Sequence, residues 1–195
     1  MRTDLDSARD AVNAGELVVY PTETVYGLGA NALEMAAIER VFAAKKRPRS
    51  KPLSMAVPDV ETARRYVSMT EREVAFASEF LPGPVTLVVE RRDVVPDALT
   101  AGRERVGIRV PDHDIARALA ETGPVTATSA NVSGRPGARR IDDVDERVLD
   151  AATVVLDDGE TPGGGSTVVD VTAEIVHRRG ADVEAVETWL EEHCS

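Results

Sequence analysis

The sequence predicts a single α/β domain with an open, twisted, mixed sheet that is flanked by helices. Short apolar runs typical of buried strands alternate with longer amphipathic segments typical of helices. Near the C-terminal end, Ser166–Val171 and Glu174–Arg178 are spaced as the two strands of a hairpin, which adds antiparallel pairing to the sheet. No repeat, linker or low-complexity segment interrupts the 195 residues, so we expect one domain.

Prolines, glycines and one capping pattern set the boundaries of the expected elements. Gly15 ends the first helix, Pro21 ends the first strand and Pro48 stops the second helix. Thr70 and Glu73 form a capping box at the start of a later helix. The expected helices span residues 4–14, 32–44, 59–67, 70–80, 113–121, 142–150 and 182–192. The expected strands span residues 17–20, 52–57, 85–90, 105–110, 125–128, 153–156, 166–171 and 174–178. The segments expected to be loops are 22–31, 91–104, 129–138 and 157–165.

The composition limits which functions are open to the chain. The 34 acidic and 23 basic residues leave a net charge of -11, which argues against broad, non-specific binding of nucleic acid but permits a local basic site. A hydrophobic fraction of 43% supplies a real core. An acidic composition with arginine in place of lysine fits a protein from a high-salt cytoplasm. Codon bias is the alternative explanation for the arginine.

Cysteine and histidine usage indicates a reducing compartment and no protein-bound metal. Cys194 is the only cysteine, so no disulfide forms within the chain. The three histidines, His113, His177 and His193, lack metal-ligand spacing. The N-terminus has no apolar signal core, and no apolar run reaches membrane-spanning length. We therefore expect a soluble, cytoplasmic protein without a membrane partner.

The most unusual stretch is Lys45–Lys51, in which five of seven residues are cationic and which holds all three lysines of the chain. Dense like charge beside Pro48 is unfavourable unless an anion neutralises it. We interpret the stretch as a clamp for a polyanion such as a nucleotide triphosphate. The alternative is a solvated basic loop at a helix end, where the helix dipole favours cations.

Two further motifs follow predicted buried strands. Pro21–Gly29 carries hydroxyls and two glycines that let a ligand approach the backbone, although its spacing matches neither a Walker A nor a dinucleotide fingerprint. Ser129–Gly134 offers Ser129 and Asn131 as hydrogen-bonding groups. Ordinary turn chemistry is the alternative for each motif taken alone. No histidine near Ser129 in the sequence indicates an activated nucleophile.

The C-terminal third adds a glycine-rich segment and two notable arginines. Gly163–Val168 resembles a phosphate-binding nest that precedes a strand, a pattern that also occurs widely without function. Arg109 near the end of an apolar strand and Arg178 before a glycine are candidates for binding an anion, since a buried guanidinium needs a negative partner. A structural salt bridge to one of the many acids is the alternative for both.

Taken in order, these motifs resemble those of the YrdC-like family over roughly residues 16–180. Eight motifs in register carry the resemblance: Pro21-Thr-Glu-Thr-Val-Tyr-Gly-Leu-Gly, Lys45-x-Arg47-Pro, Lys51-Pro-Leu, Leu81-Pro-Gly-Pro-Val-Thr-Leu, Val106-Gly-Ile-Arg-Val-Pro, Ser129-Ala-Asn-Val-Ser-Gly, Gly165-Ser-Thr-Val-Val-Asp and Arg178. The chain looks like the short members of this family, which are threonylcarbamoyl-AMP synthases. The resemblance implies one YrdC-like domain over residues 1–195, with a core at about 5–180 and without the additional C-terminal domain of longer members.

The resemblance also implies an activity, substrates and partners. Such enzymes are nucleotidyltransferases that convert L-threonine, bicarbonate or CO2, and ATP into threonylcarbamoyl-AMP with release of pyrophosphate. This is the first step of a tRNA modification, because partner proteins then transfer the threonylcarbamoyl group to the adenosine at position 37 of tRNA. Direct contact with tRNA is left open. Mg²⁺ is expected to arrive with ATP, with phosphates supplying most of its contacts.

The family's site residues carry over position by position. The catalytic signature falls on Lys45, Arg47, Ser129 and Asn131. The threonine pocket includes Thr24, Arg109 and Ser166. The nucleotide contacts include Arg47, Lys51, Ser129 and Arg178, although many members carry a small polar residue at the position of Lys51. No metal ligand within the protein is implied.

Two other functions compete with this interpretation. A non-enzymatic RNA-binding module of the same fold is supported by the local basic run and opposed by the overall acidity. A carbamoyl transferase related to hydrogenase maturation is the other alternative. Such domains lie in longer chains with zinc-finger-like and acylphosphatase regions, whereas this sequence has a single cysteine and shows no such regions.

Overall fold

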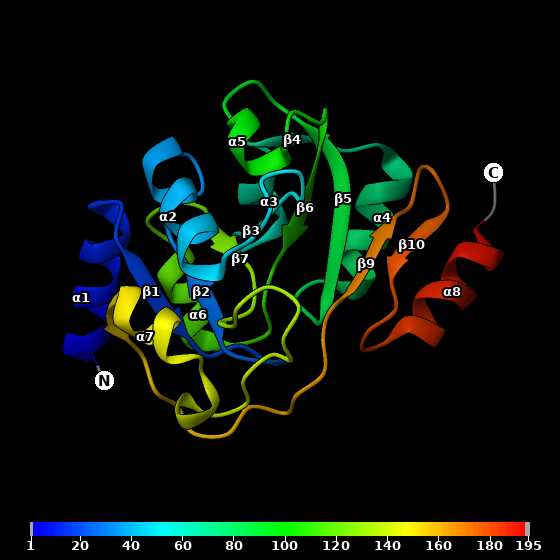
Figure 1. Cartoon of the computed structure of the whole chain (residues 1–195). Helices are drawn as coiled ribbons and strands as arrows, with labels where there is room; N and C mark the ends of the chain where they lie inside the picture. Colours follow the sequence, from blue (N-terminus) through cyan, green and yellow to red (C-terminus); the bar gives the residue numbers. More distant parts are fainter. Residues whose placement is uncertain (1, 194–195) are drawn as a thin grey trace.

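The computed structural model describes residues 2–193, so Cys194 lies outside the described residues. Figure 1 shows two groups of strands at the centre, with α1, α2 and α7 toward one end of the molecule and α4 and α8 toward the other. The helices are α1 (Arg2–Asn13), α2 (Met35–Lys45), α3 (Val60–Ala63), α4 (Glu71–Phe80), α5 (Asp97–Thr100), α6 (Asp114–Ala120), a 3-10 helix (Ile141–Asp143), α7 (Glu146–Ala151) and α8 (Val183–Glu192). The strands are β1 (Leu17–Tyr20), β2 (Gly27–Gly29), β3 (Ser54–Ala56), β4 (Val67–Ser68), β5 (Val85–Arg91), β6 (Arg105–Arg109), β7 (Val125–Ala127), β8 (Ala152–Val155), β9 (Thr167–Asp170) and β10 (Ile175–Arg178).

The strands form two sheets that mix parallel and antiparallel pairs, which confirms the expected mixed α/β architecture. The smaller sheet has the order β2-β1-β8, and the larger has the order β10-β9-β5-β6-β3-β7, with β4 paired to β5. β1 with β8, β3 with β6 and β5 with β9 are parallel, whereas β9 and β10 form the expected antiparallel hairpin. Isolated bridges from Gly27 to Ser129 and from Asn31 to Val125 connect the two sheets where β2 passes the end of β7.

Two expected helices are shorter than predicted. The helix expected over 59–67 ends at Ala63, a turn follows, and Val67–Ser68 then pair with the end of β5 as β4. The helix expected over 142–150 is divided into the 3-10 helix and α7, since the Asp145 side chain caps a new helix start. The predicted capping box of α4, by contrast, is present in full.

Two expected loops contain regular structure. The loop expected over 22–31 includes β2, which folds back antiparallel on β1. The loop expected over 91–104 includes α5, which buries Leu99 completely. Both elements are only three or four residues long, so their apolar pattern is too short to be distinguished from a loop in the sequence.

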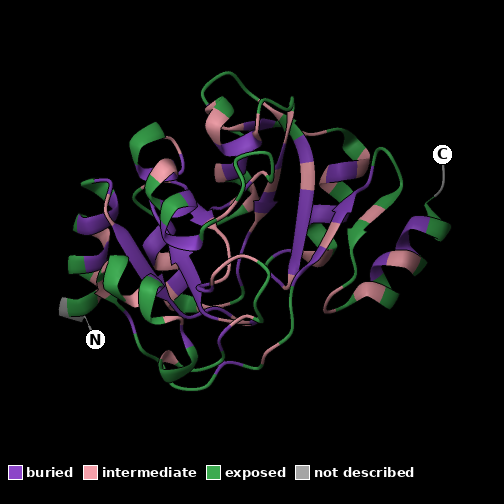
Figure 2. Ribbon diagram, viewed as in Figure 1, coloured by how far each residue is buried: buried purple, intermediate pink, exposed green. Residues whose placement is uncertain are grey.

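Two hydrophobic clusters hold these layers together. In the main cluster, Ile38 of α2 and Phe76 of α4 pack with buried residues of the larger sheet. In the second cluster, Ala8 of α1 and Leu119 of α6 pack with Val18 of β1. Figure 2 shows the strands as largely buried and the outer helix faces as exposed. Because the strands of both sheets are packed in these clusters, they hold the ends of the loops that follow them in place.

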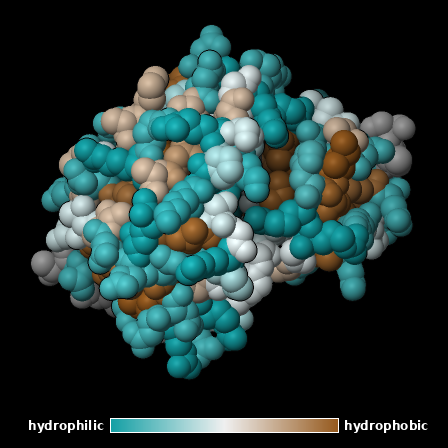
Figure 3. All heavy atoms as spheres, viewed as in Figure 1, coloured by the Kyte–Doolittle hydropathy of each residue, from teal (hydrophilic) through white to brown (hydrophobic). Residues whose placement is uncertain are grey.

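The visible surface is mostly polar. Figure 3 shows a largely hydrophilic face with separate hydrophobic patches. The exposed large hydrophobic side chains are Met35, Val94, Val155 and Ile175. Within residues 2–193, no helix combines the length and the apolar character needed to cross a membrane.

Candidate functional site

The loops of two predicted motifs lie against each other. The Leu28 N–H donates to the Thr128 carbonyl over 2.8 Å, and the Ala130 N–H donates to the Tyr26 carbonyl over 2.7 Å. Together with the bridge between Gly27 and Ser129, these bonds place β2 beside the segment that follows β7. Strand β2, which the sequence did not predict, is therefore the element that joins the motif at 21–29 to the motif at 129–134.

Lys45, the last residue of α2, is buried beneath the second of these motifs. Its side chain donates to the backbone carbonyls of Ser129 and Asn131, the latter over 2.7 Å. In return, the Ser133 N–H donates to the Lys45 carbonyl over 2.9 Å. Burial, with a further contribution from the charge of Arg47, lowers the pKa of Lys45 to about 7. Lys45 thus fixes the shape of the Ser129–Asn131 segment.

The remaining cations of the Lys45–Lys51 stretch do not converge on one point. Arg47 is partly buried and donates to the carbonyls of Lys51 (3.1 Å) and Pro52 (2.8 Å), and burial lowers its pKa. Arg49 pairs with Glu39 on the surface. The Lys51 side chain is exposed. The structure therefore divides this stretch between buried, half-buried and solvated positions.

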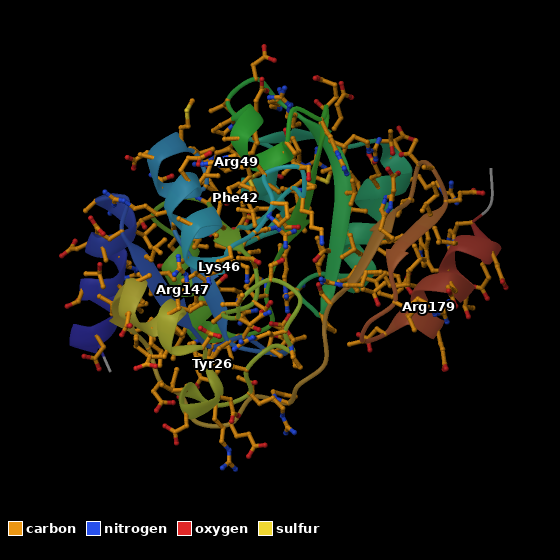
Figure 4. The ribbon with its side chains drawn as sticks, viewed as in Figure 1. Tyr26, Phe42, Lys46, Arg49, Arg147 and Arg179 are labelled. Carbon is orange, nitrogen blue, oxygen red and sulfur yellow. The ribbon has the colours of Figure 1, made fainter. Side chains whose placement is uncertain are left out.

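Figure 4 labels Lys46 and Arg147 near the C-terminal end of α2. Lys46 ends the helix in the left-handed conformation, with φ of 48°. Arg147 donates to the carbonyls of Ala43 (3.1 Å) and Ala44 (3.3 Å) in the last turn of the helix, and the Ala43 carbonyl also accepts from the Lys46 N–H. The start of the cationic stretch is therefore positioned by α7 as well as by α2.

Ser129 and Asn131 form one hydrogen-bonded unit. The Ser129 hydroxyl donates to Asn131 Oδ1. Asn131 Nδ2 donates to the carbonyls of Val132 (2.8 Å) and Arg135 (2.6 Å), so the amide group is held from both sides. Asn131 also lines a recess of about 360 Å³ next to Arg135 and Arg139.

The predicted threonine-pocket residues Arg109 and Thr24 are in direct contact. Arg109 Nη2 donates to Thr24 Oγ1 over 2.8 Å and lies 3.0 Å from Glu23 Oε1. The Gly163 N–H donates to the Thr24 carbonyl over 2.7 Å, so the glycine-rich segment passes directly beside Thr24. The end of β6, the loop after β1 and the segment before β9 therefore meet at one place.

Ser166 and Arg178 form the third part of the site. Arg178 Nε donates to the Ser166 carbonyl over 2.9 Å, and its Nη2 donates to the Ser166 hydroxyl over 2.6 Å. Thr86 Oγ1 lies 3.0 Å from the same hydroxyl and shares a hydrogen bond with it. Burial, followed by the charges of Arg109 and Arg47, lowers the pKa of Arg178. The guanidinium groups of Arg109 and Arg47, which come from two other segments, thus act on that of Arg178.

Such an arrangement favours a small polyanion. Three partly buried guanidiniums and several fixed hydroxyls are groups that recognise phosphate and carboxylate oxygens. Among residues 2–193, no group of three or more histidine, cysteine, aspartate or glutamate side chains is arranged to hold a metal ion. The guanidinium and hydroxyl groups therefore favour a negatively charged ligand.

The sequence predicted most of these residues but omitted others. The structure brings Thr24 into contact with Arg109, Ser166 into contact with Arg178, and Lys45, Ser129 and Asn131 into a third group. The charge of Arg47 acts on Lys45 and on Arg178, and the charge of Arg109 acts on Arg178, so the three groups influence one another electrostatically. The residues that we did not assign are Glu23, Thr86 and Gly163. Glu23 had a visible signal, because it lies between Thr22 and Thr24 in a motif already selected.

The fold and the candidate site together define an α/β protein in which partly buried guanidinium and hydroxyl groups gather where several strands end. A family profile for Sua5, YciO and YrdC, described as telomere recombination, matches residues 10–180. The chain is 41% identical over 165 residues to the threonylcarbamoyl-AMP synthase of Pyrococcus abyssi, covering 83% of this chain and 48% of that protein. It is 34% identical over 156 residues to a putative threonylcarbamoyl-AMP synthase of Methanocaldococcus jannaschii, covering 80% of this chain and 74% of that protein.

A solved structure shows the same fold. The crystal structure of P. abyssi Sua5 complexed with L-threonine superposes with a TM-score of 0.89 at 38% identity, covering 95% of this chain and 56% of that chain. The chain belongs to the Sua5, YciO and YrdC family, as its motifs predicted. It spans about half the length of the P. abyssi relative.

Proposed function

We propose that the chain is a threonylcarbamoyl-AMP synthase, which makes threonylcarbamoyl-AMP from L-threonine, bicarbonate or CO2, and ATP. The observation that supports this most is a cluster of three arginines: Arg109 donates to the Thr24 hydroxyl, Arg178 donates to the Ser166 hydroxyl, and the charges of Arg109 and Arg47 act on Arg178. One such cluster provides separate cations for a carboxylate and for phosphates. The names of the relatives from P. abyssi and M. jannaschii support the same activity.

In the proposed reaction, the neutral amino group of L-threonine attacks CO2, an N–C bond forms, and one proton is released to solvent to give a carbamate. A carbamate oxygen then forms a bond to the α-phosphorus of ATP. The bond from that phosphorus to the bridging oxygen breaks, and pyrophosphate leaves with the electron pair. Negative charge grows on the α-phosphoryl oxygens and on the leaving group, so catalysis requires positioning and charge stabilisation but no protein nucleophile.

Arg109, Thr24 and Ser166 are assigned to L-threonine. Arg109 Nε is buried and has no hydrogen-bond partner among the described residues, so it offers a donor to the substrate carboxylate. Thr24 already accepts a hydrogen bond from Arg109, and its position suits the substrate hydroxyl. Ser166 is held by Arg178 and lies on the same side of the site.

Arg47, Lys51 and Arg178 are assigned to the nucleotide phosphates, while Ser129 and Asn131 orient the α-phosphate or the carbamate. Lys45 supports these two residues through their carbonyls and adds its charge to the site. The carbamate is unstable in water, so the segment before β9, which contacts Thr24 through Gly163, is assigned to covering the site.

Mg²⁺ enters this proposal as part of the ATP substrate. Among the described residues, no three or more histidine, cysteine, aspartate or glutamate side chains are grouped so that they could coordinate the ion by themselves. Phosphate oxygens and water are the ligands that Mg²⁺ commonly takes at nucleotide sites. No step of the mechanism is assigned to a protein-bound metal.

The product has a place in tRNA modification. We propose that other proteins transfer the threonylcarbamoyl group to tRNA in the cytoplasm. A net charge of -11 restricts any direct contact with tRNA to a local basic surface.

The decisive experiment measures pyrophosphate release from ATP and bicarbonate with and without L-threonine. Threonine-dependent release that serine and valine do not reproduce would establish the synthase. ATP binding without release at any salt concentration would show that the isolated chain lacks the activity and that a partner is missing. Failure to bind ATP would favour the RNA-binding module.

A further inference from the structure

Glu23 places a negative charge in the middle of the cationic site. Its side chain is 14% exposed and that of Arg109 is 12% exposed, and Glu23 Oε1 lies 3.0 Å from Arg109 Nη2. Both Glu23 carboxylate oxygens are buried, yet neither accepts a hydrogen bond with acceptable geometry from the described residues. A buried carboxylate with unused acceptor positions is costly unless a ligand supplies donors.

The contrast with Glu73 shows what a structural carboxylate looks like in this chain. Glu73 is also buried, but it accepts hydrogen bonds from the Thr70 N–H (2.8 Å), the Thr172 hydroxyl (2.9 Å) and Arg105 Nη2 (2.9 Å). Its charge is thereby satisfied within the fold. Among the described residues, the only ion-pair partner of the Glu23 carboxylate is Arg109. Unlike Glu73, Glu23 therefore still has carboxylate oxygens that can accept hydrogen bonds.

We propose that Glu23 binds the α-ammonium group of the amino-acid substrate and thereby selects amino acids over other carboxylates. This inference rests on the proposed function, because it concerns the threonine side of the same site. One carbon atom separates the ammonium and carboxylate groups of an α-amino acid. A cation and an anion held in contact, as in Arg109 and Glu23, therefore face both groups of the substrate at once.

The neighbouring groups support this orientation. Arg109 Nε, the donor without a described partner, is available for the substrate carboxylate, while the open Glu23 oxygens are available for the ammonium. Thr24 lies next to Glu23 in sequence and contacts the same Arg109 nitrogen, so a β-hydroxyl has a partner nearby. The three assignments match the three polar groups of threonine.

The test compares two ligands that differ only in the amino group. L-threonine and (R)-3-hydroxybutyrate share the carboxylate and the β-hydroxyl, and each dissociation constant is measured directly by calorimetry. We expect the unaltered protein to prefer L-threonine by a factor on the order of 10–100, as for hydrogen bonds to charged groups, and Glu23→Gln to lose most of that preference. Gln keeps the shape of the side chain but removes its charge.

Matched variants separate binding from folding. Glu61→Gln alters an exposed carboxylate and should leave both dissociation constants unchanged. Glu23→Asp keeps the charge, and we expect it to retain more of the preference than Glu23→Gln. ATP binding and thermal unfolding are recorded for each variant, and if Glu23→Gln does not fold, Glu23→Asp provides the comparison.

The outcomes distinguish this inference from the proposed function. A preference that stays the same in the Glu23 variants, including one in which both ligands weaken equally, would show that Glu23 only holds Arg109 in place and would overturn the inference. Binding of L-threonine without pyrophosphate release would overturn the proposed function alone. Failure of the unaltered protein to bind L-threonine would overturn both.

Discussion

The side-chain nitrogen of Lys45 lies between the backbone carbonyl oxygens of Ser129 and Asn131, and its distance to the Asn131 oxygen is 2.7 Å. Helix α2 is thereby connected to the loop after β7, at a point where two strand-end motifs meet. A lysine in this position acts on the site through the loop that it holds as well as through its charge. This relationship leads to two separate predictions.

Activity should depend strongly on Lys45. We expect Lys45→Ala to lower threonine-dependent pyrophosphate release by about 10²–10³-fold, as for the loss of one preorganised donor, because Ser129 and Asn131 lose their support. The matched control is Lys46→Ala, since Lys46 is the adjacent lysine and is exposed. Near-normal activity of Lys45→Ala would remove Lys45 from the catalytic assignment.

Stability should depend on pH through the same residue. Burial lowers the pKa of Lys45 from 10.5 to about 7 in the folded protein, so between these values the unfolded chain binds more protons than the folded chain. The free energy of unfolding should therefore rise with pH in this window by up to about 1.4 kcal/mol per pH unit. A neutral amine still has two N–H groups for the two carbonyls, so these bonds survive deprotonation.

Urea unfolding at pH 7 and pH 9 tests this expectation. The rise between the two values should be larger in the unaltered protein than in Lys45→Met, which keeps an apolar side chain but cannot titrate. Equal slopes for the two proteins would mean that Lys45 is charged in both the folded and unfolded states at pH 9.

Arg178 should need its planar guanidinium. It reaches both the carbonyl and the hydroxyl of Ser166, a two-point contact that a lysine ammonium cannot reproduce. We expect Arg178→Lys to raise the KM for ATP by about tenfold, the equivalent of one hydrogen bond to a charged group. Arg179→Lys is the neighbouring control, because Arg179 is exposed and pairs with Glu187 on α8 (Figure 4 labels Arg179). A KM that changes equally in both variants would contradict the assignment.

Tyr26 should anchor the segment that leads to β9. Its hydroxyl lies 2.9 Å from Asp157 Oδ1 and 2.7 Å from the Gly159 carbonyl, and it accepts a hydrogen bond from the Asp158 N–H. Tyr26→Phe should lower the free energy of unfolding by about 1–2 kcal/mol and speed amide exchange over residues 157–165. Hydrogen exchange followed by mass spectrometry measures both the segment and the rest of the chain. Unchanged exchange in that segment would show that other contacts, such as Gly163 to Thr24, are sufficient.

Stability should rise with salt if the acidic composition reflects adaptation to high salt. Like charges repel at a net charge of -11, and the Debye length falls from about 10 Å at 0.1 M to about 3 Å at 1 M salt. We expect the melting temperature to increase from low to high potassium chloride. Chloride is preferred to sulfate in this test, because sulfate stabilises folded proteins by exclusion from their surface. Full stability at low salt would leave codon bias as the explanation for the arginines.

Local patterns predicted much of the fold. Pro21 marked the end of β1 correctly, the capping box at Thr70 marked the start of α4, and the hairpin of β9 and β10 followed from spacing alone. Each of these features depends on residues that are close in sequence. Short elements such as β2 and α5 were missed, since three or four residues contain too few apolar positions to establish a repeat.

The sequence by itself determined the class of fold and the family, because strand periodicity, turn chemistry and the order of motifs can be read along the chain, and it predicted the candidate site residues. Only the tertiary structure decided how these residues meet. It placed Lys45 under a loop more than eighty residues away, and it placed Glu23 beside Arg109 with open acceptor positions. Such contacts depend on how strands pair and where buried charges find partners, and neither is encoded within any single stretch of the chain.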